Sequence, residues 1–167
     1  MRKIWLLGLM TALLVAGCAV PAHWRGELTK RDIFLNLMTP EQAATFKTME
    51  AEQKDEELLI LYCQEIGVYQ KWKALLPARQ EVVRRGRPAE GLTPDELRMV
   101  WGAPGKIEDI TDSAERSEGH KRELWSFDPK ADRQGAVAFE RQACFLDEKL
   151  LWFKGVRRQP SLWPRFW

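Results

Sequence analysis

The chain has 167 residues, of which 45% are hydrophobic and 30% are charged, a composition typical of globular proteins and not of disordered ones. It carries 26 Lys and Arg against 24 Asp and Glu, and two of the bases, Arg2 and Lys3, lie at the start. The rest of the chain is therefore balanced in charge. This argues against nucleic acid as the main partner, because phosphate binding requires a basic surface.

Residues 1–17 have the pattern of a removable secretory signal. A positive start precedes an uncharged apolar run, residues 4–15, which is too short to cross a bilayer core of about 30 Å as a helix. Two small residues then lead directly into Cys18, as in the bacterial lipobox. The pattern predicts that Cys18 carries a diacylglyceryl group and, once it is the first residue, an acyl chain such as palmitate. An ordinary signal peptide that contains a cysteine is the alternative.

The residue after Cys18 bears on localisation. In lipoproteins of this kind an Asp at that position tends to retain the protein in the inner membrane, and here the residue is Ala19. We therefore expect a protein anchored to the periplasmic face of the outer membrane. Each buried CH2 adds about 0.8 kcal/mol, so several acyl chains would hold it almost permanently.

The next two segments are predicted to be a tether, residues 18–38, and a helical region, residues 39–88. Thr39 begins a capping box before a long helical pattern. A break is expected near Asp55, and Pro77 should end or kink the helix. Six acids lie within residues 41–57 and six bases within residues 71–87 of this region. They either form solvated faces that suit the helix dipole or leave a basic patch for a partner.

Residues 91–105 contain the clearest local signals. Thr93 and Glu96 form a capping box at the start of a helix predicted over residues 94–101. Gly102 ends this helix. The expected apolar face, with Leu97 and Trp101, should lie on the sheet that follows.

After this helix the hydrophobic period changes from 3.6 to 2. We predict short antiparallel strands joined by polar turns; they cover residues 106–112, 122–128, 136–146 and 150–154. The fold class is therefore α+β, a helical N-terminal region followed by a short helix packed on an antiparallel sheet of three to four strands. The helix should contact the sheet near Trp125, Phe127 and Phe139. The tryptophans of the apolar faces are interpreted as core; they are Trp72, Trp101, Trp125 and Trp152.

The order of these motifs resembles the BamE/SmpA/OmlA lipoprotein family. The matching residues read Gly91-Leu92-Thr93-Pro94-Asp95-Glu96-Leu97, Gly102-Ala103-Pro104, Leu124-Trp125-Ser126-Phe127 and Val137-Ala138-Phe139. The resemblance covers residues 89–155 and implies a small α+β module, also seen in β-lactamase inhibitor proteins. It further implies an accessory role in outer-membrane protein assembly. The long helical region departs from the family, as does Asp147-Glu148-Lys149 in place of a tight Asn/Asp-Gly turn.

No pattern in the sequence indicates an enzyme. A nucleophile beside a base, a metal-ligand spacing and a phosphate loop are all lacking, so we predict no catalytic, cofactor-binding or metal-binding residues and expect no small-molecule substrate. The expected partners are the membrane, through Cys18, and an envelope protein. The first hypothesis is a non-catalytic binding or scaffold protein. The alternatives are an inhibitor or regulator of a periplasmic enzyme and an envelope hydrolase.

Two further features leave their interpretation open. Cys63 and Cys144 either form a disulfide, as pairs in oxidising compartments often do, or remain two separate buried thiols. The segment 156–167 is rich in aromatic and basic residues. It either folds back on the domain or contacts a membrane surface or a partner.

Overall fold

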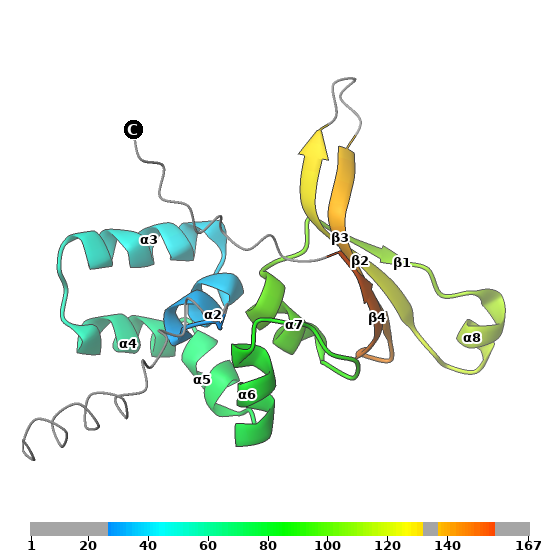
Figure 1. The fold of residues 1–167 in the computed structure, drawn as a ribbon, viewed down its shortest axis with the longest axis horizontal. Helices are drawn as coiled ribbons and strands as arrows, with labels where there is room; N and C mark the ends of the chain where they lie inside the picture. The colour runs from blue at the N-terminus through cyan, green and yellow to red at the C-terminus, as the bar shows by residue number, and fades with distance from the viewer. Residues whose placement is uncertain (1–26, 132–136, 156–167) are drawn as a thin grey trace, which may run out of the picture.

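The computed structural model describes residues 27–131 and 137–155. The predicted signal, Cys18 and the aromatic tail lie outside the described residues. Figure 1 shows the first five described helices, within residues 30–84, on one side of the molecule and the sheet on the other, with the next helix, α7 (Pro94–Trp101), between them. This arrangement of helices and an antiparallel sheet confirms the predicted α+β class.

The helical part is divided more finely than the sequence pattern predicted. It comprises α2 (Lys30–Leu37), α3 (Pro40–Ala51), α4 (Glu56–Glu65), α5 (Val68–Lys73) and α6 (Pro77–Arg84). A break falls near Asp55, as expected, and Pro77 opens α6. A further break at Gly67 was not predicted. Gly67 has a φ of +81°, a left-handed conformation that ends α4 at little cost only with glycine.

The prediction that the tether extends to residue 38 is wrong. The side chain of Thr29 accepts a hydrogen bond from the backbone N–H of Asp32, and Asp32 bonds back to Thr29, so α2 begins here with a capping box. Ile33 and Phe34 of α2 are buried in the core. The apolar residues that seemed to precede the fold therefore belong to it.

The sheet has the order β1-β2-β3-β4, with every neighbouring pair antiparallel. Its strands are β1 (Lys106–Asp109), β2 (Arg122–Ala131), β3 (Val137–Leu146) and β4 (Lys149–Lys154). The predicted polar loop between β1 and β2 contains a short helix, α8 (Ser113–Ser117), which Asp112 and Glu115 cap. The β2–β3 hairpin extends beyond the other two strands (Figure 1).

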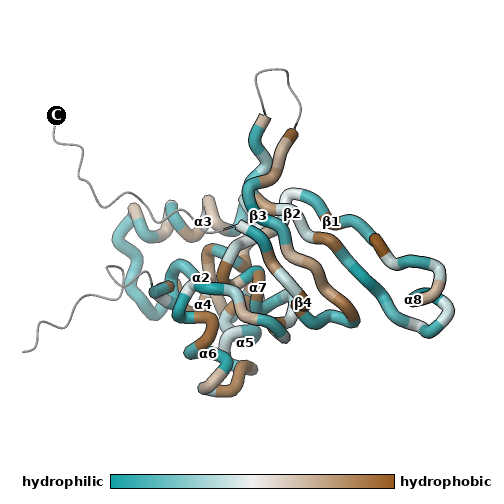
Figure 2. The backbone as a smooth tube through the Cα atoms, turned by 45° about the vertical axis from the view of Figure 1, so that its right-hand side comes forward, coloured by the Kyte–Doolittle hydropathy of each residue, from teal (hydrophilic) through white to brown (hydrophobic). Residues whose placement is uncertain are grey.

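Helix α7 joins the two halves of the molecule. Its capping box forms as predicted, and Leu97 is fully buried. The ring of Trp101 packs edge-on against Phe127, with ring centres 5.2 Å apart. Phe139, expected in the same contact, lies instead beside Gly105 at the start of the extended hairpin. Figure 2 shows hydrophobic residues of α7 lying beside the strands.

The helical part and the sheet share one hydrophobic core. Buried residues of α2, α5, α6, α7 and the sheet belong to a single cluster. The side-chain amide of Asn36 in α2 donates a hydrogen bond of 2.8 Å to the carbonyl of Met99 in α7. The helical region is therefore an integral layer of this fold.

The two cysteines are both free and buried in the structure, so the disulfide alternative is not supported. Cys63 belongs to the shared core. Cys144 lies in β3 between Ala143 and Phe145, which face that core, and successive side chains of a strand point to opposite faces. The two thiols are thus on opposite sides of the sheet. Burial raises the pKa of the Cys63 thiol to about 11, which keeps it protonated and unreactive.

Candidate functional site

The most distinctive surface of the molecule is the outer edge strand β4. Leu151, Trp152 and Phe153 are consecutive in this strand, and they are 37%, 42% and 40% exposed. Trp152 was predicted to be core, and that prediction is wrong, whereas the other three tryptophans in that set are buried. Together with Leu150, the three exposed residues make four apolar residues in a row, and successive side chains of a strand point to opposite faces, so the four cannot all turn toward one core. We name Leu151, Trp152 and Phe153 the β4 surface.

The side chains of the β4 surface project to both faces of the sheet. Trp152 pairs with Cys144, on the face away from α7, and Phe153 pairs with Ala143, on the core face. The ring of Phe153 stands edge-on to Trp101, with ring centres 6.2 Å apart. The pairing with β3 is irregular at Leu151, so Leu150 lies opposite Phe145 on the core face, whereas Trp152, two residues later, lies on the other face.

A buried arginine supports the β4 surface from beneath. The guanidinium of Arg141 lies 4.8 Å from the ring centre of Trp101 and donates to both carboxylate oxygens of Asp128. Asp128 has a positive φ of +52°, so this ion pair holds a backbone conformation that Asp adopts uncommonly. The Nη1 atom of Arg141 is buried and has no hydrogen-bond partner among the described residues. The cluster fixes Trp101, and through it the position of Phe153.

A two-residue turn leads into β4. Asp147 and Glu148 both have positive φ values, +47° and +61°, where a hairpin of this kind usually has Asn or Gly. Asp147 accepts a hydrogen bond of 2.9 Å from the backbone N–H of Lys121, which lowers the pKa of its carboxyl. His120 Nδ1 lies 2.6 Å from the same carboxylate, and this hydrogen bond raises the pKa of His120. The side chain of Asp147 thereby stabilises a turn that its sequence alone does not favour.

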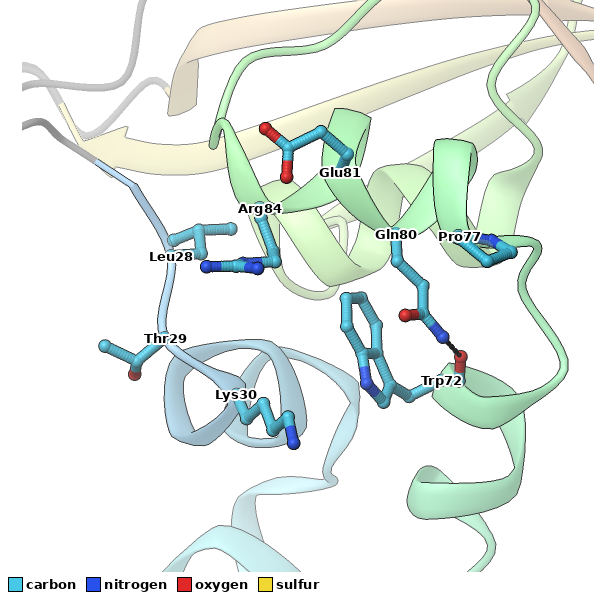
Figure 3. A pocket seen from close by; sticks show the side chains of 8 residues that line it. All are labelled: Leu28, Thr29, Lys30, Trp72, Pro77, Gln80, Glu81 and Arg84. Atoms are coloured by element: carbon cyan, nitrogen blue, oxygen red, sulfur yellow. Dashed lines mark hydrogen bonds between the residues drawn. The ribbon is translucent and has the colours of Figure 1, made fainter. Parts of the chain in front are cut away.

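A hollow of about 500 Å³ lies where the chain enters α2, beside α5 and α6 (Figure 3). It is lined by Leu28, Thr29, Lys30, Trp72, Pro77, Gln80, Glu81 and Arg84. The backbone N–H of Leu28 donates a hydrogen bond of 2.7 Å to the carbonyl of Arg84, so the entering chain is fixed to the end of α6. The Gln80 amide donates to the carbonyl of Trp72 at 3.1 Å.

The chemistry of this hollow does not resemble that of an active site. The Thr29 hydroxyl is bound to the carboxylate of Asp32 at 2.7 Å. Glu81 lies 3.5 Å from Arg85 in an exposed ion pair. A hydrolase needs a nucleophile within reach of a base, and the lining residues do not bring such a pair together.

Several bases of the predicted basic stretch are used within the fold. Arg79 forms a two-pronged ion pair with the buried carboxylate of Glu96 in α7. Lys71 lies 3.0 Å from Asp95, at the start of the same helix. These bases connect α5 and α6 to α7, and the Lys71 side chain remains 48% exposed.

Other site types were sought in the part of the chain that the structure describes. Among residues 27–131 and 137–155, no cluster of three or more His, Cys, Asp or Glu side chains is placed to hold a metal ion. Within the same ranges, no helix has the length and apolar character needed to cross a membrane.

Comparisons of the chain with protein-family models, with curated proteins and with solved structures find no significant match. The resemblance to the BamE/SmpA/OmlA family thus rests on the motifs of residues 89–155 alone, and any function drawn from it is a proposal.

Proposed function

We propose that this protein is a non-catalytic binding or scaffold protein of the bacterial envelope. It is anchored through Cys18 to the periplasmic face of the outer membrane and serves outer-membrane protein assembly or envelope integrity. The observation that carries the proposal is the exposed β4 surface. Exposed aromatic residues gathered on one strand favour a partner-binding surface, whereas an enzyme would be expected to have a deep polar cleft.

The order of the chain supports the same proposal. A lipobox-like segment at Cys18 precedes a short polar stretch and then a folded domain that starts at Thr29. Such a protein is concentrated at a membrane, where its partners also reside. A regulator of a periplasmic enzyme would use the same kind of surface, and the partner recovered in the second experiment below separates these two functions.

The first experiment tests the anchor. Cys18→Ser should abolish labelling with palmitate and move the protein out of the outer-membrane fraction, because the thiol that receives the lipid is gone. Membrane fractionation and palmitate labelling of both proteins measure this. A Cys18→Ser protein that still floats with outer membranes and still labels would contradict the proposed anchor.

The second experiment tests the β4 surface by crosslinking in intact envelopes. Trp152→Lys should remove crosslinks to a defined partner. Leu61→Lys, which changes a residue 56% exposed on α4, should retain them. Recovery of barrel-assembly components supports the assembly role, and recovery of a soluble periplasmic enzyme supports the regulatory one. Equal crosslinking by both variants would show that β4 is not the binding surface.

A further inference from the structure

The two edges of the sheet differ in how they meet solvent. Edge strands expose unpaired backbone groups, and proteins commonly protect them with charges or short strands. Strand β1 has both kinds of protection. It spans only Lys106–Asp109, and Lys106 lies 2.8 Å from Glu108 in an ion pair. Asp109 is paired with Arg116 of α8 at 3.4 Å.

Strand β4 lacks this protection over most of its length. Its first apolar residue, Leu150, exchanges two backbone hydrogen bonds of 2.8 Å with Gly91 and Leu92, so the loop before α7 covers the start of the edge. Beyond Leu150, no backbone hydrogen bond joins the side of β4 away from β3 to any other described residue. The uncovered part, Leu151–Lys154, contains the whole β4 surface.

We propose that β4 accepts an extended segment of a partner protein as an additional strand along Leu151–Lys154. The inference rests on the proposed binding function and specifies the partner's chemistry. An added strand places alternate side chains on both faces of a sheet. The β4 edge offers an aromatic ring to each face, Trp152 on one and Phe153 on the other. The segment therefore carries apolar side chains toward both.

The charge at the end of the uncovered part defines the partner further. Lys154 is exposed there and forms no ion pair with a described residue. Lys149, at the other end of β4, precedes Leu150, where the loop covers the edge. Opposite charges across neighbouring strands are favourable, and like charges are unfavourable. The segment that fits this edge is therefore apolar and carries an acid opposite Lys154.

The same charge favours a partner segment over a second copy of the chain. If the uncovered parts of two β4 strands paired antiparallel, Lys154 of one copy would lie opposite Leu151 of the other. Both lysines would then face an apolar residue and lack an acidic partner. A partner segment with an acid opposite Lys154 supplies one.

The experiment measures binding of a short synthetic peptide, with consecutive valines in its middle and glutamate at both ends, so that an acid can meet Lys154 in either strand direction. Its fluorescence anisotropy is followed with the full chain carrying Cys18→Ser. Binding is expected. Methylation of alternate backbone amides of the peptide should weaken it by about tenfold or more, because two or more strand hydrogen bonds are lost. Replacing both glutamates by lysine should also weaken it.

Matched variants place the peptide on β4. Trp152→Lys should abolish binding, while Ile107→Lys should not change it, since Ile107 is similarly exposed, at 46%, on the protected edge β1. Lys154→Glu changes no apolar contact. It should reverse the charge preference, so that the peptide with lysine ends binds better than the peptide with glutamate ends. This reversal keeps the test valid should Trp152→Lys fold poorly.

Four outcomes would overturn the inference. They are no binding of the glutamate peptide to the wild-type chain, equal binding of the methylated peptide, equal loss in Ile107→Lys, and a concentration-dependent dimer that Trp152→Lys abolishes. The last would identify a second copy as the occupant. None of these results bears on palmitate labelling or on envelope crosslinks, so failure here is distinguishable from failure of the proposed function.

Discussion

Helices α3 and α7 begin with nearly the same four residues, Thr-Pro-Glu-Gln at 39–42 and Thr-Pro-Asp-Glu at 93–96, and both form a capping box. The backbone N–H of Thr39 donates to the Gln42 side chain at 3.0 Å, and that of Thr93 donates to Glu96 at 2.7 Å. Yet Phe46 is the one buried residue of α3, whereas five of the last six residues of α7 are buried, all except Arg98. The cap decides where a helix starts, and the apolar residues that follow decide how deeply it is buried.

The two caps also differ in the acid or amide at the third helical position. Gln42 is neutral and its helix faces solvent, whereas Glu96 is 3% exposed and ion-paired with Arg79. Burial raises the pKa of Glu96, but hydrogen bonds from Arg79 and Thr93 lower it more, so the net pKa is below the usual 4.5. Glu96 therefore serves both the cap and the contact between α6 and α7.

The largest expected effect comes from the buried face of α7. Trp101→Ala should cost about 3 to 5 kcal/mol of unfolding free energy, because the ring is buried against Phe127 and Arg141. Phe46→Ala should cost about 3 kcal/mol or less, because α3 borders solvent and can shift to fill the space. Urea unfolding of a chain starting after Cys18 measures both. An unchanged midpoint in Trp101→Ala would show that Trp101 is not part of the core.

An intermediate effect is expected from Arg79→Ala, about 2 kcal/mol, since it leaves a buried carboxylate without its cation. The figure is reduced because the Arg79 side chain is 34% exposed. Arg85→Ala, which breaks the exposed pair with Glu81, is the control and should cost at most about 0.5 kcal/mol.

The pH dependence of Arg79→Ala follows from the sign of the Glu96 shift. In the wild type, a lowered folded-state pKa gives stability that is present above pH 4.5 and is lost as the pH falls through the folded pKa. Without Arg79 less opposes the effect of burial, so the folded-state pKa of Glu96 rises. The variant should therefore begin to lose stability at a higher pH than the wild type. Urea midpoints from neutral to acid pH measure this, and identical pH profiles would contradict the role given to Arg79.

The smallest effects concern the caps themselves. Thr93→Ala should cost about 1 kcal/mol of global stability. Thr39→Ala should change the global value less, because α3 can open locally while the core stays folded. Native-state hydrogen exchange should then show faster exchange confined to the amides of α3. Equal global costs would mean that α3 unfolds only together with the core.

Local signals predicted α7, the antiparallel strands and the α+β class, because a capping box or an alternating pattern is complete within a few residues. Helix α8 carried such a signal, Asp112 with Glu115, but it lay in a polar stretch that suggested only a loop. Strand alternation places the side chain of Cys144 on the other face of the sheet from those of Ala143 and Phe145, which face the core. This signal alone could have argued against a disulfide with Cys63.

The position of Trp152 could not be predicted in the same way. Whether a strand lies at the edge or the centre of a sheet depends on pairing between segments far apart in sequence. Nothing in residues 149–154 states that β4 is last in the order. The partner of the buried Glu96 is a similar case, because Arg79 comes from a different helix and its basic neighbours suggested an exposed face.

The hydrogen bond from Leu28 to Arg84 has a consequence for how the proposed anchor would work. It fixes the point where the linker from Cys18 meets the folded body. Nine residue steps separate Cys18 from Glu27, so even when fully extended this linker spans at most about 30 Å. With Cys18 acylated as proposed, the domain would sample only a thin shell above the bilayer. A partner in the same membrane would then meet β4 at a high effective concentration, and an intrinsically weak edge contact would suffice to hold it.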